Sequence, residues 1–266
     1  CASASDWNNF IINYNKTLYG KGSQTWQIGS YSSNWSYFAN KNGMLQFDGN
    51  SWNIFPLKNG SDVRSVLPSV SQKRIYAGGI NEFGFEPGDD GRLIYTCMSD
   101  SLDATSRAIG NVWGIHENDN ILYLQGDGRV LKFLNGKYTT IEMNCKIDCS
   151  DMVNGVLYIG TDHGVRVLVG NTFFPLQGAE VLKSKRIRSI IPYKDGVLVV
   201  TAYDGLFYCD GRTTVPFLTG VESFMRQNEV FCAAASGGKI ALGTIHKGIL
   251  LIDTQTKRIK FFNEYN

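Results

Sequence analysis

The sequence lacks the residue patterns that many enzymes and metalloproteins require. It has only three histidines and no Cys–His spacing typical of a zinc site. It also lacks a Gly-x-Ser-x-Gly elbow, a phosphate-binding loop and a His-Glu-x-x-His helix. These absences remove the usual marks of serine hydrolases, nucleotide-binding proteins and zinc proteases. We therefore predict no catalytic residues, no metal and no cofactor, and expect that the chain is not an enzyme.

Long apolar runs and an excess of charge of either sign are also missing. No run approaches the roughly 18 consecutive apolar residues that a membrane-spanning helix needs. Lys and Arg number 26 against 24 Asp and Glu, which leaves a net charge of only +2 at pH 7. A protein with so weak a field is not expected to bind nucleic acid or an anionic membrane surface through this domain.

Glycine is plentiful, and six glycines mark a repeated unit. The fifth copy, Val197–Gly211, is an apolar run, a polar turn ending in a glycine, a second apolar run and an Asp-Gly turn. The turn glycines of the six copies, spaced by 36 to 44 residues, are Gly43, Gly84, Gly128, Gly164, Gly205 and Gly248. Several short strands repeated at this period are typical of a β-propeller. We predict an all-β β-propeller of four-stranded antiparallel blades, with six blade repeats here; a seventh blade beyond this sequence stays open.

Each repeat contains four strand-like runs and almost no helical pattern. In the fifth repeat they are Ile187–Tyr193, Val197–Thr201, Leu206–Cys209 and Thr213–Phe217. The first runs of the other repeats are Thr25–Ser30, Val63–Val70, Asn111–His116, Ile147–Val153 and Val230–Ala235. Because the first strand of a blade lines the central channel and the fourth is outermost, these first runs are the predicted channel walls.

The repeats occupy residues 23–266, and residues 1–22 form a separate N-terminal segment. The first residue is Cys1, and two interpretations are open: it is the lipid-accepting cysteine of a lipoprotein, or Ala2–Ala4 is the cleavage site of a secretory signal. Both predict export. The run Phe10–Tyr14 resembles the last strand-like run, Ile259–Phe262, and is a candidate for a ring-closing strand on the outer edge of the last blade.

Several segments of the chain resemble a known family. They are Trp26–Ile28, Tyr37–Trp52, Val63–Ser65, Arg74–Gly79 and Asn81–Phe85. They are similar to the two-component-regulator propeller family, the exported sensor regions of bacterial membrane-spanning regulators, and above all to its triple-tyrosine-containing subgroup. The resemblance covers nearly the whole chain and is densest over residues 14–85. It implies a periplasmic domain that is membrane-anchored in the parent protein, with a triple-tyrosine domain, a membrane span and a signalling output as downstream partners.

Candidate binding residues lie at the start of the predicted inner strands. Counting back 17 positions from the turn glycine reaches Trp26, Ile147, Arg188 and Phe231, and Arg64 and Trp113 take the same place where turns are longer. Trp26, Arg64, Trp113, Arg188 and Phe231 are therefore predicted to surround one mouth of the channel. Aromatic faces and arginine forks suit a carbohydrate or an anionic ligand. The alternative is that the aromatic side chains fill the channel and the arginines bond backbone carbonyls of neighbouring blades.

The turns between the second and third strands share that face of the ring and add Glu82, His163, Tyr203 and His246 to the candidate ligand-binding residues. His163 and His246 would serve as a metal or acid–base pair only if the ring brought them together; otherwise they are exposed turn residues. Cys145 and Cys149 lie in one inter-blade stretch, and a disulfide between them stays open. The long entering loops, Met98–Gly110 and Leu218–Glu229, also favour this face for recognition.

We therefore predict a ligand-sensing extracytoplasmic propeller of a bacterial signal-transduction receptor, which binds a small molecule or oligosaccharide, most simply a carbohydrate. Two other functions are open. One is a propeller enzyme acting on glycans, a lyase or hydrolase that uses His163 and His246, although the repeated box of sialidase propellers is absent. The other is a protein-interaction propeller. The sequence leaves a homodimer open as well.

Overall fold

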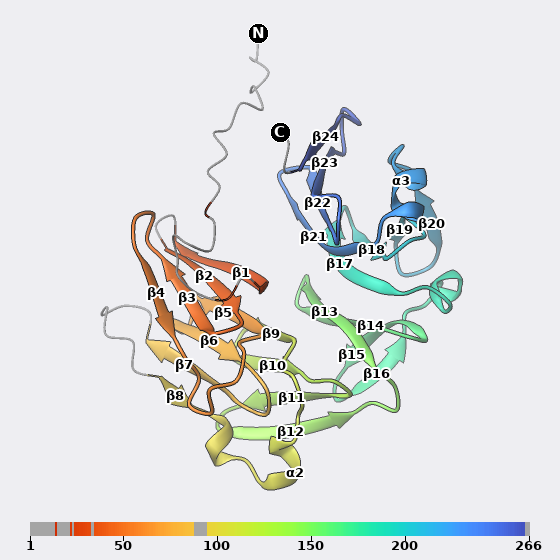
Figure 1. Ribbon diagram of the computed structural model, residues 1–266. Helices are drawn as coiled ribbons and strands as arrows, with labels where there is room; N and C mark the ends of the chain where they lie inside the picture. The colour runs from red at the N-terminus through yellow and green to blue at the C-terminus, as the bar shows by residue number, and fades with distance from the viewer. Residues whose placement is uncertain (1–13, 15–21, 23, 33–34, 88–94, 264–266) are drawn as a thin grey trace.

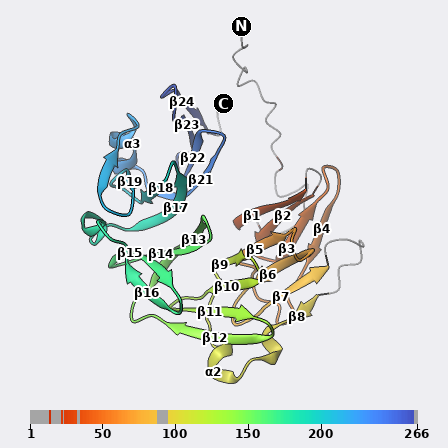
Figure 2. The ribbon, with the colours of Figure 1, turned by 180° about the vertical axis from the view of Figure 1, so that it is seen from behind.

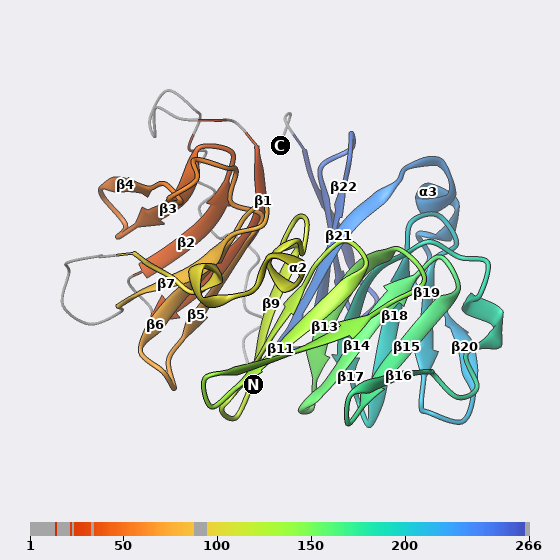
Figure 3. The ribbon, with the colours of Figure 1, turned by 90° about the horizontal axis from the view of Figure 1, so that it is seen from below.

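Six four-stranded antiparallel sheets follow one another around a common axis in the computed structural model of the protein (Figure 1). The structure describes residues 14, 22, 24–32, 35–87 and 95–263. In every sheet the four strands are neighbours in the order of the sequence, so each sheet is a simple meander. Figure 3 shows the blades from the side, with the strands of the fourth and fifth blades packed next to one another. The predicted fold, a six-bladed and nearly all-β propeller, is confirmed.

The blades have the following strands. Blade 1 contains β1 Thr25–Ser32, β2 Trp35–Asn40, β3 Gly43–Phe47 and β4 Trp52–Phe55. Blade 2 contains β5 Ser65–Ser69, β6 Arg74–Gly78, β7 Phe83–Pro87 and β8 Thr96–Cys97. Blade 3 contains β9 Gly114–Asn118, β10 Ile121–Gln125, β11 Arg129–Leu134 and β12 Lys137–Glu142. Blade 4 contains β13 Ile147–Val153, β14 Val156–Thr161, β15 Gly164–Val169 and β16 Thr172–Pro175. Blade 5 contains β17 Ile187–Tyr193, β18 Gly196–Thr201, β19 Leu206–Cys209 and β20 Thr214–Phe217. Blade 6 contains β21 Val230–Ser236, β22 Lys239–Thr244, β23 Ile249–Asp253 and β24 Ile259–Phe262.

The strand predictions hold closely in blades 4 and 5. The inner strands of blades 2 and 3 begin two and three residues later than predicted, at Ser65 and Gly114, and one turn is misplaced. β13, β17 and β19 have the predicted bounds, and β18 starts one residue early. In blade 2, however, Gly84 lies inside β7, and the turn before it is residues 79–82. Asn81 takes the left-handed conformation there, with φ of 55°. Asparagine tolerates this conformation better than most residues, so the turn does not need the glycine that the repeat pattern assigned to it.

Short helices interrupt the long loops that enter the blades. α2 (Ala104–Arg107) and the 3-10 helix η1 (Ser99–Ser101) lie in the loop entering blade 3, η2 (Glu180–Leu182) precedes blade 5, and α3 (Glu222–Gln227) precedes blade 6. Asp103 caps α2 by accepting hydrogen bonds from the backbone N–H groups of Thr105 and Ser106. Cap bonds of this kind satisfy N–H groups that have no partner inside a helix. The sequence predicted loops here, without these single turns of helix.

A buried β-branched residue at the entry to the inner strand of blades 2 to 6 holds consecutive blades together. Val63, Val112, Ile147, Ile187 and Val230 occupy this place in blades 2 to 6, and each is at most 2% exposed. They belong to the apolar clusters that pack neighbouring blades face to face. In blade 1 the corresponding residue, paired in the same way with the end of the second strand, is Thr25, which is exposed.

The ring is open between blades 1 and 6, as Figures 1 and 2 both show. Within the described residues, these two blades do not pack against one another as consecutive blades do. Ile28 on β1 is 63% exposed and Ile249 on β23 is 48% exposed. Tyr14 packs on blade 1, with its ring 5.0 Å from Phe47 and 5.7 Å from Trp52. The rest of the predicted ring-closing strand, residues 10–13, lies outside the described residues, so ring closure by that strand stays a prediction, as does a seventh blade.

Glu86 is a buried carboxylic acid between blades 1 and 2. Its side chain lies on β7 and is only 2% exposed. One carboxyl oxygen has no hydrogen-bond partner within the described part of the chain. Burial disfavours the charged form and raises the pKa of Glu86 to about 7. The folded protein therefore keeps this proton in a pH range where the unfolded chain has already lost it.

We expect Glu86→Gln to remove part of the pH dependence of stability. A glutamate in the unfolded chain has its ordinary pKa of 4.5 and the folded one a pKa near 7, so wild-type stability falls as the pH rises through this interval. By pH 8 the loss amounts to about 3 kcal/mol, at 1.36 kcal/mol for each pKa unit. Denaturant unfolding of both proteins at pH 5 and pH 8 measures it. If the difference in the free energy of unfolding between wild type and variant is the same at both pH values, Glu86 ionises with its ordinary pKa.

Candidate functional site at the mouth of the channel

Irregular pairing at the start of the inner strands marks one mouth of the channel. The register with the second strand shifts between Thr25 and Gln27 in blade 1, and in the same way in blades 4, 5 and 6. The residues left unpaired by these bulges are Trp26, Asp148, Arg188 and Phe231. In blades 2 and 3 the corresponding residues are Arg64 and Trp113. Bulges at the rim of a barrel-like fold commonly redirect side chains toward a functional site.

Arg64 joins three blades at this mouth. Its guanidinium carbon lies 3.9 Å from the centre of the Trp26 ring and 5.2 Å from that of Trp113. Nε donates to Asn111 Oδ1 at 3.2 Å, and Nη2 lies 3.3 Å from a carboxylate oxygen of Asp62. Cation–π contacts of this kind contribute about 0.5–2 kcal/mol each, which holds the guanidinium between the two indoles. We call Trp26, Arg64 and Trp113 the aromatic–arginine stack.

Trp113 is the exposed end of this stack. Its side chain is 39% exposed. Its indole Nε1 donates to Asp127 Oδ1 at 2.8 Å, while the other oxygen of Asp127 accepts from the backbone and side-chain nitrogens of Asn111. The hydrogen bond fixes the orientation of the ring, so the open part of its face is presented to solvent as a rigid apolar platform beside carboxylate and amide groups.

A second cluster lies at the mouth where blades 5 and 6 meet. Glu229 accepts hydrogen bonds from Arg188, from Arg186 at 3.1 Å and from the Tyr203 hydroxyl at 2.7 Å. The tyrosine hydroxyl and the guanidinium groups favour the carboxylate and hold the pKa of Glu229 below its ordinary value. The guanidinium carbon of Arg188 lies 5.4 Å from the ring centre of Phe231, which is 46% exposed.

Six predicted residues thus fall into two groups: Trp26, Arg64 and Trp113 in one, and Arg188, Tyr203 and Phe231 in the other. Arg64 bonds to a carboxylate and a side-chain amide, and Arg188 bonds to a carboxylate; among the described residues neither donates to the backbone carbonyls considered from the sequence. Asp148 was missed. The turn of blade 4 is one residue shorter than that of blade 5, so counting from its glycine reached Ile147. Counting from the threonine that ends the second strand would have found Asp148.

Glu82 is placed apart from the two clusters. Its side chain is completely buried, and its two oxygens accept from the backbone nitrogens of Lys58 at 2.7 Å and Asn59 at 2.9 Å. These bonds tie the loop that leaves blade 1 to the turn of blade 2. Both carboxylate oxygens are engaged inside the protein, so the contacts of Glu82 are structural ones.

The structure does not bring His163 and His246 together. Both are exposed turn residues, and the whole of blade 5 lies between the turns that carry them. Among the described residues, His163 forms an ion pair only with its neighbour Asp162, with Nε2 and Oδ1 3.8 Å apart. Within the described residues, no three His, Cys, Asp or Glu side chains are grouped so that they could hold a metal ion. Cys145 and Cys149, for which a disulfide was open, are both free thiols.

The third histidine is part of a hydrogen-bonded chain between the inner strands of blades 3 and 4. His116 Nε2 lies 2.7 Å from the Ser150 hydroxyl, which donates to Gln125 Oε1 at 2.6 Å. Burial lowers the pKa of His116 to about 4, so the ring is neutral at pH 7. On the same strand as Ser150, Asp151 accepts from the backbone nitrogen of Ile190 in blade 5 at 2.7 Å, and burial raises the pKa of Asp151 to about 7.

No protein-family model and no curated protein matches the sequence. The structure is similar to solved β-propellers of low sequence identity. The WD40 propeller domain of Doa1 has a TM-score of 0.70 at 10% identity, covering 91% of this chain and 84% of that one. YCF48 bound to D1 peptide has a TM-score of 0.70 at 12% identity, covering 94% and 86%. The extracellular domain of the putative one-component system BT4673 from B. thetaiotaomicron has a TM-score of 0.68 at 15% identity, covering 92% of this chain and 34% of that one.

These likenesses establish the fold. This chain spans about a third of the BT4673 extracellular domain. Among the described residues, no helix has the length and apolar character needed to cross a bilayer. The protein is a β-propeller similar to extracellular domains of bacterial signalling proteins and to propellers from other settings.

Proposed function

We propose that this propeller is the ligand-binding, periplasmic part of a membrane-anchored bacterial signal-transduction receptor. It binds a carbohydrate or related small molecule at the mouth of its channel. The sequence resemblance to the two-component-regulator propeller family supports the receptor role, including the triple-tyrosine domain and membrane span downstream. The structural likeness to the BT4673 extracellular domain is consistent with that resemblance.

The observation that carries the proposal is the aromatic–arginine stack. Sugars are bound by packing their C–H faces on aromatic rings and by hydrogen-bonding their hydroxyls to charged and amide side chains. Trp113 offers a fixed and partly exposed ring, and Asp62, Asn111 and Asp127 surround the stack with acceptors and donors. Phe231 and Tyr203 offer exposed rings in the second cluster, at 46% and 43%. A ligand spanning both clusters would connect blades 1 to 3 with blades 5 and 6.

We expect Trp113→Ala to weaken ligand binding about tenfold or more, the loss that corresponds to about 1.5 kcal/mol of aromatic packing. The measurement is calorimetric titration of the protein with a panel of neutral and acidic oligosaccharides. The variant loses the cation–π contact with Arg64 and the hydrogen bond to Asp127, so it should melt somewhat below the wild type, and its melting curve is recorded to show that it still folds. Arg188→Ala tests the second cluster in the same way.

Two matched controls separate this mouth from the rest of the surface. Phe174→Ala removes another exposed ring, on β16, and Lys137→Glu reverses a charge beside the turn at Asn135, on the opposite face of the ring. Both should bind like the wild type. Loss of binding in Lys137→Glu, with Trp113→Ala and Arg188→Ala unaffected, would place the site on the opposite face. Binding of a peptide but of no oligosaccharide, lost in Trp113→Ala, would favour a protein-interaction propeller.

A further inference from the structure

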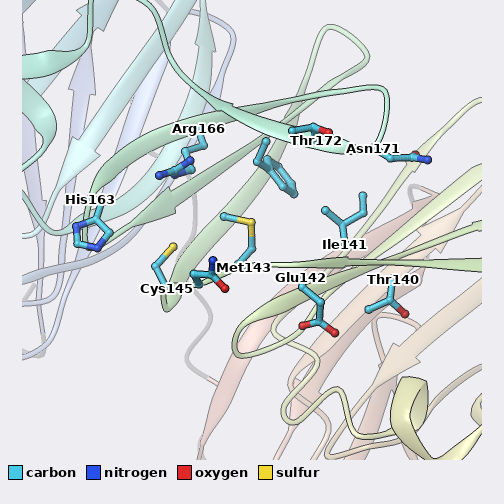
Figure 4. A pocket seen from close by; sticks show the side chains of 11 residues that line it. Thr140, Ile141, Glu142, Met143, Cys145, His163, Arg166, Asn171 and Thr172 are labelled. Carbon is cyan, nitrogen blue, oxygen red and sulfur yellow. The ribbon is translucent and has the colours of Figure 1, made fainter.

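A second candidate site lies away from the channel, in a cavity between the outer parts of blades 3 and 4. Its volume is about 660 Å³, within the range of small-molecule sites. Blade 3 contributes Thr140 to Cys145, and blade 4 contributes His163, Arg166 and residues 171–173. Figure 4 shows Arg166, His163 and Cys145 toward one end of the cavity, with Thr140 and Glu142 toward the other.

Arg166 stands at a position that the repeat otherwise gives to an apolar core residue. This position follows the turn on the third strand, and its side chain faces the preceding blade. Leu45, Leu131, Phe207 and Leu250 occupy it in blades 1, 3, 5 and 6, and none of them is more than 6% exposed. In blade 2 the residue is Gly84, and the ring of Tyr95 lies where a side chain would be, 2.7 Å from an ideal Cβ. Blade 4 alone has a charged side chain here.

The charge of Arg166 has no counter-charge in the described part of the protein. No carboxylate there forms an ion pair with it, and its buried Nε has no hydrogen-bond acceptor. The one acidic residue lining the cavity, Glu142, lies 3.2 Å from Arg129 instead. Arg166 is half-buried as a whole, but its Nε is buried, and the desolvation of that donor is not compensated by a hydrogen bond to any described residue. A ligand that supplies the missing acceptor would remove that cost.

The rest of the cavity has the chemistry of a small polar site. Thr140, Thr172 and Asn171 supply hydroxyl and amide groups, and Lys132 donates to Asn171 Oδ1 at 3.0 Å, which fixes that amide. Ile141, Met143 and Phe173 supply an apolar wall. His163, one of the residues singled out in the sequence, lines this cavity rather than the channel mouth.

We propose that this cavity binds a small organic molecule that bears an oxyanion, and that the guanidinium of Arg166 is its anchor. The planar fork of arginine forms paired hydrogen bonds with a carboxylate, sulfate or phosphate group, and Nε is one of the two donors in such a pair. The threonine and asparagine groups bind hydroxyls on the remainder of the molecule. This cavity is separate from the channel mouth. Absence of anion binding in the cavity would therefore leave the proposed function at the channel mouth untouched, and absence of binding at the mouth would leave the cavity proposal untouched.

The test compares glucuronate with glucose, its uncharged counterpart, and with inorganic sulfate and phosphate, by calorimetry and by thermal shift. We expect glucuronate to bind and raise the melting temperature, and glucose not to do so. Binding of sulfate or phosphate in preference to glucuronate would assign the oxyanion to those groups. Arg166→Leu installs the residue type of the other blades, so it should fold at least as well as the wild type while weakening binding about ten- to a hundredfold, the loss expected for a hydrogen bond to a charged group.

Two more variants and a chemical probe make the result specific. Arg166→Lys keeps the charge without the fork and should bind with intermediate affinity. Arg226→Leu, an exposed arginine of α3, changes the net charge equally and should bind like the wild type. Cys145 lines the cavity, so bound glucuronate should slow its labelling by a thiol reagent, as mapped by peptide mass spectrometry, without slowing that of the exposed Cys232. Wild-type affinity in Arg166→Leu, or no binding of any anion to the wild type, would overturn the proposal.

Discussion

Replacing Glu82 with alanine is expected to lower the free energy of unfolding by about 3–5 kcal/mol, because it removes two backbone hydrogen bonds that end on one buried carboxylate. The carboxylate of Glu82 is completely buried and accepts from Lys58 N and Asn59 N, in the loop that connects blade 1 to blade 2. Asn59 is held there as well by its side-chain amide, which donates to the Ile80 carbonyl at 2.9 Å. Denaturant unfolding followed by circular dichroism measures the loss.

Glu82→Gln is the matched control. Glutamine keeps the length of the side chain and one acceptor oxygen, so it should lose roughly half as much stability as Glu82→Ala. The pair also decides between two roles for this residue, since the sequence pattern grouped Glu82 with the ligand-binding residues. If Glu82→Ala melts like the wild type but fails to bind a ligand, the carboxylate serves recognition and its structural role is wrong.

The blade pattern could be predicted from the sequence because every repeat contains the same order of apolar runs and turns. Alternating apolar runs with glycine or Asp-Gly between them specify a four-stranded meander, and six copies leave few alternatives to a ring. The turn chemistry was less regular than the pattern suggested. Asp48 and Asp210 accept hydrogen bonds from the backbone two and three residues on, and only the following glycines take positive φ. The aspartates therefore act as turn-forming acceptors, and the turns need a positive φ at one position only.

The clusters at the channel mouth were predicted in part. Equal spacing from the turns found Trp26, Arg188 and Phe231, since a repeat places equivalent residues at equivalent heights, and Arg64 and Trp113 were found once longer turns were allowed for. It did not find Glu229, which joins Arg188 to Tyr203, because Glu229 lies in a loop where the repeat imposes no position. It also gave no sign that Glu82 is buried. A residue that faces the channel mouth and a residue that holds a loop in place can have the same spacing from the turn glycine. Only their contacts in the structure distinguish them.

Gly160 on β14 and Gly243 on β22 are equivalent positions that differ in what lies over them. A Cβ on Gly160 would lie 2.6 Å from Cβ of Ile187, in the next blade, and 2.7 Å from Sγ of Cys149. A Cβ on Gly243 would lie 2.7 Å from Sγ of Cys232 in its own blade, and no atom of another blade is among its neighbours within the described chain. The two sites thus share the cysteine contact, and only Gly160 is covered by a following blade.

We expect Gly160→Ala to lower the free energy of unfolding by about 2–3 kcal/mol, because the branched carbon of Ile187 cannot move without separating blades 4 and 5. Gly243→Ala should lower the free energy of unfolding by less than about 1 kcal/mol, because the cysteine sulfur can rotate away from the new methyl group. Both variants also gain the same stability from a less flexible unfolded chain. Unfolding of the two variants in parallel measures the difference, which is independent of those shared contributions. Equal losses would mean that another element packs on blade 6 as Ile187 packs on blade 4. The faces of blades 1 and 6 that now lie open would then be internal surfaces of a closed ring.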